Sequence, residues 1–267
     1  MDTDTRLFRY KYRDCNPSNL KIITEGTLYF SSPTNFNDPF DSSPAYDLKS
    51  IDEIFRRRPD LIKRVGDSMG LSPARRLMKK TQFIANARKC VESGEWAKSL
   101  MSTVGVFCVS RNPCNPLMWA HYAKDHSGFV VEFKIDMNSP RELLESIIPM
   151  PVNYCKETPI LDWGASGRNI EDYLLTKSPD WEYEEEERIL DVTGGPGVYP
   201  YSREHFLSSV IVGVRTSADD LHLIRAAVEK ASTDIGRSIP IYQARLSNTD
   251  YKVYIPDHPD SRLSSAR

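Results

Sequence analysis

Residues 181–190 read WEYEEEERIL, and the conformation of this stretch decides the fold that we expect around it. Five carboxylates occupy the six positions 182–187, and such crowding causes like-charge repulsion unless a cation lies nearby. As a strand, the segment would place Glu184, Glu186 and Arg188 on one face, as a Glu-x-Glu pair beside a guanidinium. As a helix, it would only pair Glu184 with Arg188 on a solvated surface. The apolar residues that follow Arg188 favour the strand.

Length and composition are typical of a folded protein without a membrane span. The chain has 267 residues, 40% of them apolar, which is enough for one large domain that carries an insertion. No apolar run approaches the roughly 18 residues that cross a bilayer, and the acidic start is unlike a signal peptide. We therefore expect a cytoplasmic protein. The five scattered cysteines indicate neither a disulfide framework nor a thiolate zinc site.

The charges are unevenly distributed along the chain. Residues 49–98 carry 13 Lys or Arg against 6 acids, whereas residues 171–191 carry 9 acids against 2 bases. One region is suited to an anion and the other to a cation. Apolar residues at helical spacing over 48–100 predict a helical block inserted into the domain. Its basic residues are either nucleic-acid contacts or the charged outer faces of amphipathic helices.

The rest of the chain predicts short strands with few helices between them, which is typical of an α+β protein. Residues 7–13 alternate aromatic and basic side chains, so we expect a first strand with Arg9, Lys11 and Arg13 on one face. The polar loop 36–41, FNDPFD, is of a kind that presents side chains to ligands. Further strands are expected at 27–30, 104–110, 129–135, 206–214, 239–246 and 251–255, and helices at 20–25, 116–126, 170–177 and 218–231.

Several short motifs in the sequence resemble motifs of the domain of unknown function 2971 family. The most specific are FNDPFD at 36–41 and MWAHY at 118–122. The others are YKYR at 10–13, HSG at 126–128, Lys177 with WEYE at 181–184, Glu186 to Arg188, and VIVG at 210–213. The resemblance covers nearly the whole chain and by itself implies no activity.

The order of these parts also resembles the ADP-ribosyltransferases of the bacterial toxin type, especially those that modify nucleic acid. A basic first strand, a helix and strand that end in a polar loop, a central aromatic element and a late Glu-x-Glu follow one another. The first strand has no His, and the Ser-Thr-Ser word of arginine-modifying members is absent. The resemblance implies an α+β fold with a split mixed and antiparallel sheet. We predict one such domain over residues 1–256, a helical insertion at about 48–100, and a flexible tail at 257–267.

The resemblance implies NAD as the substrate. Cleavage of the ribose–nicotinamide bond passes through an oxocarbenium-like state, which a fixed carboxylate stabilises. Glu186 is the candidate for this role, and Glu184 would orient the acceptor or take its proton. Basic residues would bind the diphosphate or ribose, aromatic rings would stack on the nicotinamide, and polar residues would line the mouth. The predicted NAD-binding residues are Lys11, Tyr12, Arg13, Asn37, Asp38, His121 and Tyr122.

Each candidate also has a purely structural interpretation. Tyr12 fits a core aromatic with a satisfied hydroxyl, and His121 fits a donor to a backbone carbonyl. Asn37 and Asp38 fit a turn braced by its own side chains. Arg188 fits an ion-pair partner of the neighbouring glutamates.

Three hypotheses follow. The first is an NAD-dependent ADP-ribosyltransferase or NAD glycohydrolase, a bacterial toxin or phage-defence effector with a nucleic-acid or protein acceptor and an antitoxin as partner. The second is a non-catalytic ligand-sensing or nucleic-acid-binding module that uses residues 49–98. The third is a metal-dependent nuclease that uses Glu132, Glu184, Glu186 and His121. His121 and His126 are five residues apart and do not share a helix face, so we predict no metal site.

Overall fold

A mixed β-sheet forms the centre of the computed structural model, which describes residues 5–43, 45–46, 48–145, 147–161 and 170–266. The strand order is β13-β12-β5-β1-β4-β10-β6, and all pairs are antiparallel except β12 with β13. The sheet and the helices confirm the predicted α+β class. The strands are β1 (Arg6–Arg13), β4 (Gly105–Ser110), β5 (Phe129–Asp136), β6 (Met150–Pro151), β10 (Glu186–Asp191), β12 (Leu207–Val212) and β13 (Ile241–Gln243).

The central strands β1 and β4 separate over most of their length. β1 pairs with β5 over eight residue positions, from Arg6 to Arg13, and β4 pairs with β10 along six. Between β1 and β4 the registered contact is a single pair, Tyr10 with Ser110. The sheet therefore consists of two halves joined near this pair, and the strands diverge toward Arg13.

Alternation along β5 and β12 divides the core between the two faces of the sheet. Phe129, Val131 and Val210 pack on the face that is covered by α1 (Pro17–Thr24) and α11 (Ala218–Ile235). The intervening Val130 and Ile211 pack on the other face. That face is covered by α7 (Pro116–Tyr122) and by the C-terminal elements β14 (Arg245–Leu246), β15 (Val253–Tyr254) and α12 (Ser261–Ser264).

The C-terminal segment differs from the predicted flexible tail. His258 is buried, and its Nε2 lies 3.0 Å from Oε1 of the buried Glu132. The backbone N–H of Ile255 donates to the carbonyl of Leu263 and ties α12 to the body. Residues after Pro256 pack against the sheet because a buried carboxylate on β5 needs a partner.

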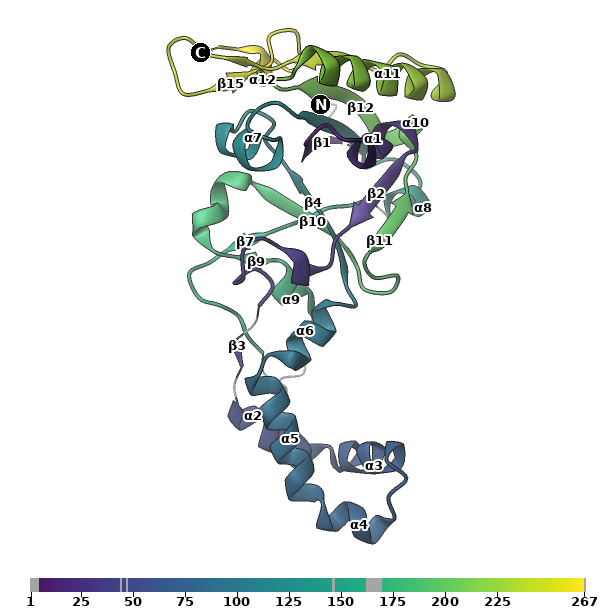
Figure 1. Ribbon diagram of the computed structural model, residues 1–267, viewed down its shortest axis with the longest axis vertical. Helices are drawn as coiled ribbons and strands as arrows, with labels where there is room; N and C mark the ends of the chain where they lie inside the picture. Colours follow the sequence, from purple (N-terminus) through teal and green to yellow (C-terminus); the bar gives the residue numbers. More distant parts are fainter. Residues whose placement is uncertain (1–4, 44, 47, 146, 162–169, 267) are drawn as a thin grey trace.

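Helices occupy the segment that was predicted to be a helical block. Helices α2 to α5 project away from the sheet as an extension, here called the arm, and α6 connects the arm to β4 (Figure 1). Several arm arginines form ion pairs with arm carboxylates, which agrees with charged outer faces of amphipathic helices. These pairs are Arg57–Glu53, Arg58–Asp60, Arg76–Asp67 and Arg88–Asp52. The bounds are α2 (Leu48–Arg57), α3 (Pro59–Ser68), α4 (Pro73–Met78), α5 (Lys80–Glu92) and α6 (Glu95–Met101).

Short elements complete the described chain. β2 and β11 form a separate antiparallel pair, and β3 with β8 and β7 with β9 form two short parallel pairs. The predicted helix 170–177 is shorter than expected, because the chain turns into β9 after Leu174. The bounds are β2 (Thr27–Phe30), η1 (Pro33–Asn35), β3 (Ala45–Tyr46), α8 (Arg141–Leu144), β7 (Asn153–Tyr154), β8 (Ile160–Leu161), α9 (Ile170–Leu174), β9 (Thr176–Lys177), η2 (Pro179–Glu184), β11 (Gly197–Pro200) and α10 (Arg203–Phe206).

Candidate functional site

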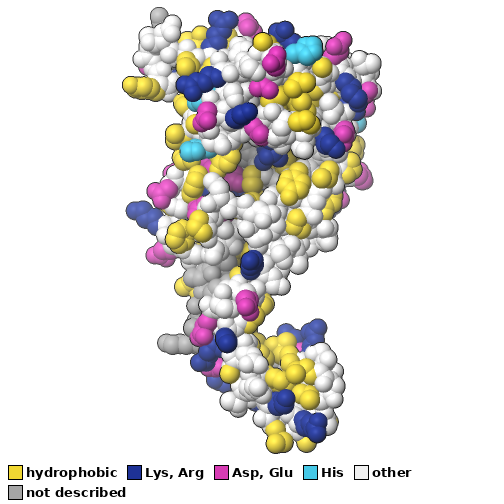
Figure 2. Space-filling view, viewed as in Figure 1, with side chains coloured by type: hydrophobic (Ala, Val, Ile, Leu, Met, Phe, Trp, Pro, Cys, Tyr) yellow, Lys and Arg dark blue, Asp and Glu magenta, His cyan; other side chains and the backbone are white. Residues whose placement is uncertain are grey.

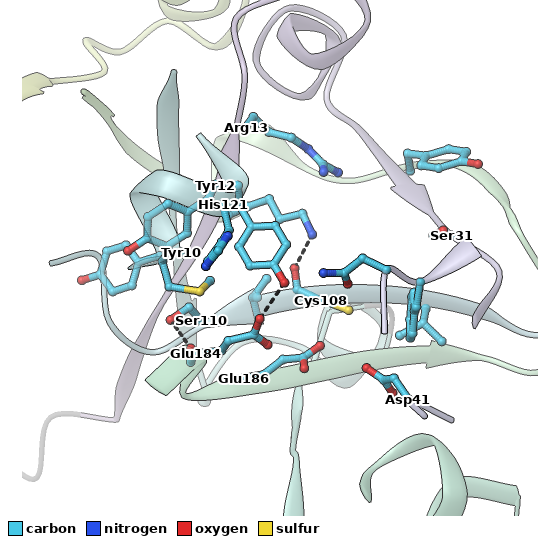
Figure 3. Close-up of a pocket in the computed structure, with 18 of the residues that line it drawn as sticks. Tyr10, Tyr12, Arg13, Ser31, Asp41, Cys108, Ser110, His121, Glu184 and Glu186 are labelled. Atoms are coloured by element: carbon cyan, nitrogen blue, oxygen red, sulfur yellow. Dashed lines mark hydrogen bonds between the residues drawn. The ribbon is translucent and has the colours of Figure 1, made fainter. Parts of the chain in front are cut away.

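A cavity of about 480 Å³ lies where β1 and β4 diverge. This volume is within the range of small-molecule sites. β1 lines it with residues 10–13, and the acidic segment lines it with Glu184 and Glu186. Figure 3 shows Arg13 on one side of the cavity and the two glutamates on the other. Basic and acidic residues from opposite parts of the chain therefore meet at one cavity.

The structure brings most of the predicted site residues to this cavity. The lining residues predicted from the sequence are Lys11, Tyr12, Arg13, Asn37, His121, Tyr122, Glu184 and Glu186. Asp38 is not among them, and its Oδ1 accepts a hydrogen bond of 2.9 Å from the backbone N–H of Phe40. The structure therefore does not bring Asp38 to the cavity with the other predicted residues, and its side chain braces the turn. Asp41, at the end of the same loop, lines the cavity instead.

The two glutamates reach the cavity from different local structures. Glu184 ends the 3-10 helix η2, and Glu186 begins β10, so the segment is neither the continuous strand nor the helix that the sequence suggested. Glu185 between them has φ of 45°, in the left-handed region, and bends the chain between η2 and β10. The Ser110 hydroxyl donates to the Glu184 carbonyl over 2.7 Å, and Asn112 donates to the Glu185 carboxylate over 2.8 Å. These bonds from the end of β4 hold the bend.

Arg188 is the buried cation that the acidic segment requires. Its side chain has no exposed surface. It donates two hydrogen bonds to Asp41, of 2.9 and 2.6 Å, and two to Glu186, of 2.9 and 3.0 Å. A further bond of 2.6 Å goes to the carbonyl of Leu174. The predicted pairing of Arg188 with a neighbouring glutamate is therefore present, and Arg188 orients two carboxylates of the site.

Lys177 joins the remaining carboxylate to this cluster. Its amine donates to Glu184 and, over 2.9 Å, to Glu186, and it lies 3.6 Å from Asp41. Three carboxylates thus surround two cations. When all five groups are ionised, the cluster carries one net negative charge.

The surroundings of Glu184 and Glu186 shift the pKa values of the two carboxyl groups in opposite directions. Burial acts to raise the pKa of Glu186, but the Arg188 guanidinium and the Lys177 ammonium outweigh it and hold this pKa well below its ordinary value. Burial raises the pKa of Glu184 above its ordinary value against the attraction of Lys177, and the charge of Glu186 adds to this shift. Glu184 also accepts a 2.6 Å hydrogen bond from the Tyr122 hydroxyl. One carboxylate is fixed in its charged form, and the other is suited to carry a proton.

The opposite wall carries a lysine and an arginine. Lys11 donates a 2.5 Å hydrogen bond to the carbonyl of Cys108 on β4, and its amine lies 4.7 Å from the centre of the Phe107 ring. Burial and the neighbouring Arg13 guanidinium lower the pKa of Lys11 to about 7. The side chain of Arg13 makes no hydrogen bond or ion pair with any residue that the structure describes. Its guanidinium keeps five unused donors for a ligand.

Among the aromatic candidates, Tyr12 is a core residue. It is 3% exposed, its hydroxyl donates to the Asn112 carbonyl over 2.7 Å, and its ring meets Trp119 edge to face at 5.3 Å. It therefore offers little ring surface to a ligand. Tyr29 on β2 lines the cavity and is 54% exposed, and it was not among the predicted residues. The exposed His121 lies near the rings of Tyr122 and Tyr183, at 6.2 and 6.3 Å.

Two further residues of the site, Asp41 and Lys177, were missed although the sequence carried a signal for both. Asp41 ends the FNDPFD word and Lys177 precedes the WEYE word, and both words were singled out for a resemblance. The side chains of the two residues are 4% and 6% exposed. A buried lysine is nearly always paired, which agrees with the carboxylates around Lys177.

The structure does not bring together the metal ligands that the third hypothesis, a metal-dependent nuclease, requires. Glu132 is not among the residues that line the cavity; it accepts hydrogen bonds from Ser209 and Tyr10 and contacts His258. In the part of the chain that the structure describes, no three His, Cys, Asp or Glu side chains are grouped as metal ligands. No described helix has the length and apolar character that crossing a membrane requires.

The glutamates of the cavity lie within a segment of the chain that matches a known family model. Residues 118–189 match the family model of the protein of unknown function DUF2971. The DUF2971 match begins in α7 and ends in β10, so it contains Tyr122, Lys177, Glu184 and Glu186. β1 lies outside the matched residues. The comparisons with curated proteins and with solved structures gave no match.

Proposed function

We propose that the protein cleaves NAD between nicotinamide and ribose, as an ADP-ribosyltransferase or an NAD glycohydrolase. The observation that supports this is the single cavity with a carboxylate wall and a cationic wall. A pyridine dinucleotide needs both, because its diphosphate is anionic and its nicotinamide ring is cationic. The exposed Tyr29 ring adds a surface on which a flat cationic ring stacks.

The two glutamates take different roles in this proposal. Glu186 stays ionised beside Arg188 and Lys177, and it stabilises the positive charge that develops on the ribose as nicotinamide leaves. Glu184 is the proton carrier, because its pKa is raised and Tyr122 orients it. It takes the proton of the water molecule or acceptor nucleophile that attacks the ribose carbon. The bond to nicotinamide breaks, the bond to the acceptor oxygen or nitrogen forms, and the proton goes to Glu184.

The proposal extends to a toxin or phage-defence effector that modifies nucleic acid or protein, with an antitoxin as partner. The open position of the cavity between β1 and β4 supports attack by a macromolecular nucleophile. The direct test incubates the full-length protein with NAD and measures released nicotinamide, together with transfer of label from the adenylate to DNA, RNA or protein. Nicotinamide release without label transfer identifies a glycohydrolase. Absence of both rejects the proposal.

Arg13 is expected to bind the diphosphate. Arg13→Ala should raise the KM for NAD about 10- to 100-fold, because hydrogen bonds to charged groups contribute about 1.5–3 kcal/mol. The kcat should change much less, since Arg13 does not touch the carboxylate wall. Arg225→Ala, on the exposed surface of α11, is the matched control and should leave KM unchanged. A normal KM in the Arg13 variant would remove Arg13 from the binding site.

A second candidate function, nucleic-acid binding by the arm, is supported by basic side chains at the free end of the arm. Arg75, Lys79 and Lys80 are exposed, and none of them forms an ion pair within the described residues. Figure 2 shows Lys and Arg side chains at this end, next to hydrophobic ones. Such a surface is suited to phosphate contacts.

The arm is tested by the salt dependence of DNA or RNA binding. Replacement of Arg75, Lys79 and Lys80 by Gln should reduce the slope of log K against log salt by up to about 2.7, because each lost contact to duplex DNA contributes about 0.9. The same replacement of Lys124, Arg141 and Arg225, which are exposed on the body, is the control. An equal slope in all three proteins would reject the arm as the contact surface.

A further inference from the structure

We propose that Lys11 and Arg13 form a covalent capture site for phosphorylated aldehydes, in which the Lys11 amine forms an imine with the carbonyl carbon and Arg13 binds the phosphate. Open-chain ribose phosphates and ADP-ribose belong to this class, since each has an aldehyde and a phosphate ester. The inference does not rest on the proposed function, because the cavity alone carries it.

The geometry on β1 places the two groups together. Lys11 and Arg13 are two residues apart on one strand, so both side chains project to the same side, and both line the cavity. The Lys11 amine has one described hydrogen bond, to the Cys108 carbonyl, and rests on the Phe107 ring. Arg13 has no described partner, so it is available for the phosphate while the amine meets the aldehyde.

Lys11 differs from a surface lysine in its proton affinity. Burial and the Arg13 charge lower its pKa to about 7, against the opposing effect of Cys108, Glu186 and Glu184. An ordinary lysine has a pKa of about 10.4, so at pH 7.5 only about one amine in a thousand is neutral. Lys11 is mostly neutral at this pH. A neutral amine is the nucleophile in imine formation.

The reaction balances without an added oxidant or reductant. The nitrogen lone pair of Lys11 attacks the carbonyl carbon, and one amine proton passes to the carbonyl oxygen to give a carbinolamine. The C–O bond then breaks, the oxygen leaves as water with the second amine proton, and a C=N bond forms. Glu184, which lines the same cavity, is suited to relay this proton: it protonates the departing hydroxyl and takes the second amine proton in exchange.

The test uses pyridoxal 5′-phosphate as the probe on the full-length protein. One equivalent is added at pH 7.5, the imine is reduced with borohydride, and the labelled lysines are mapped by peptide mass spectrometry. We expect label at Lys11 to exceed label at the exposed Lys21 about tenfold or more. The proposal would be overturned if the exposed lysines were all labelled to a similar extent and Lys11 were labelled little.

Two comparisons distinguish capture by Lys11 and Arg13 together from reaction of the Lys11 amine alone. Pyridoxal, which lacks the phosphate, should label Lys11 about tenfold less than the phosphate form, and Arg13→Ala should remove this difference. Labelling of Lys11 should reach half its maximum near pH 7, whereas labelling of Lys21 should still increase above pH 9. Equal labelling by both probes would exclude Arg13 as the phosphate ligand. Because this assay contains no NAD, its outcome is independent of nicotinamide release.

Discussion

Replacement of Arg188 by Met should lower the free energy of unfolding by about 3–5 kcal/mol, because it leaves two buried carboxylates without their main partner. Arg188 has no exposed surface and donates two hydrogen bonds each to Asp41 and Glu186. Urea unfolding at pH 7 measures the effect. Arg141→Met is the matched control, since Arg141 is 87% exposed and pairs with Glu145. The control should change stability by less than about 0.5 kcal/mol.

The pH dependence of this difference follows from Glu186. Its pKa is lowered in the folded protein, so its ionisation contributes stability above its unfolded pKa and loses that contribution as pH falls toward the folded value. In Arg188→Met the pKa of Glu186 rises, and this contribution shrinks. The stability difference between the two proteins should therefore be largest near neutral pH and narrow below about pH 4.

A triple variant addresses the case in which Arg188→Met does not fold. Arg188→Met combined with Asp41→Asn and Glu186→Gln removes the guanidinium together with the two carboxylates that it would otherwise leave unpaired. Neutral replacement of a buried cation together with its carboxylate partners is often tolerated, so the triple variant should be more stable than the single one. A triple variant that is no more stable than Arg188→Met, or a single variant as stable as wild type, would contradict the assigned role of Arg188.

Glu184→Gln should lower the kcat for nicotinamide release or label transfer about 10²- to 10⁴-fold, which is the usual range for a general acid or base. The amide keeps the shape of the side chain but carries no transferable proton of this kind. Glu185→Gln is the matched control, because Glu185 is adjacent in sequence and its carboxylate accepts from Asn112 instead of facing the cavity. We expect the control to retain nearly full activity.

The fold of the Glu184 variant should be preserved better than that of Glu186→Gln. Glu186 accepts from Arg188 and Lys177, so its loss leaves two buried cations short of a partner. Glu184 contributes one bond to Lys177 and one to Tyr122. Unchanged turnover in Glu184→Gln, with unchanged thermal stability, would show that Glu184 carries no proton in the reaction.

Local sequence patterns predicted which side chains share a face of a strand, but not which strands and loops meet at the cavity. The alternation that placed Lys11 and Arg13 on one face of a strand is a property of the backbone and holds in β1. The meeting of this strand with Glu184 and Glu186 depends on the separation of β1 from β4 after one registered pair. Strand pairing over a hundred residues of sequence has no local signal.

The bend at Glu185 had no signal in the residue type. A left-handed conformation favours Gly or Asn, and a glutamate there is uncommon. Asp38 is the opposite case, because Asp before Pro is a known turn residue and the side chain does brace the turn. The turn interpretation of Asp38 was open in the sequence, and the structure selects it. For His258, burial depends on Glu132, which lies 126 positions earlier.

We propose that the cavity between β1 and β4 binds a pyridine dinucleotide, and calorimetric titration of the Glu184→Gln protein with NAD measures this binding. This variant should bind NAD at one site without consuming it. We expect one equivalent of NAD to bind with measurable heat, and the added Arg13→Ala substitution to weaken this binding about tenfold or more. Absence of binding to NAD and to ADP-ribose in a folded Glu184→Gln protein, or binding that Arg13→Ala leaves unchanged, would contradict it.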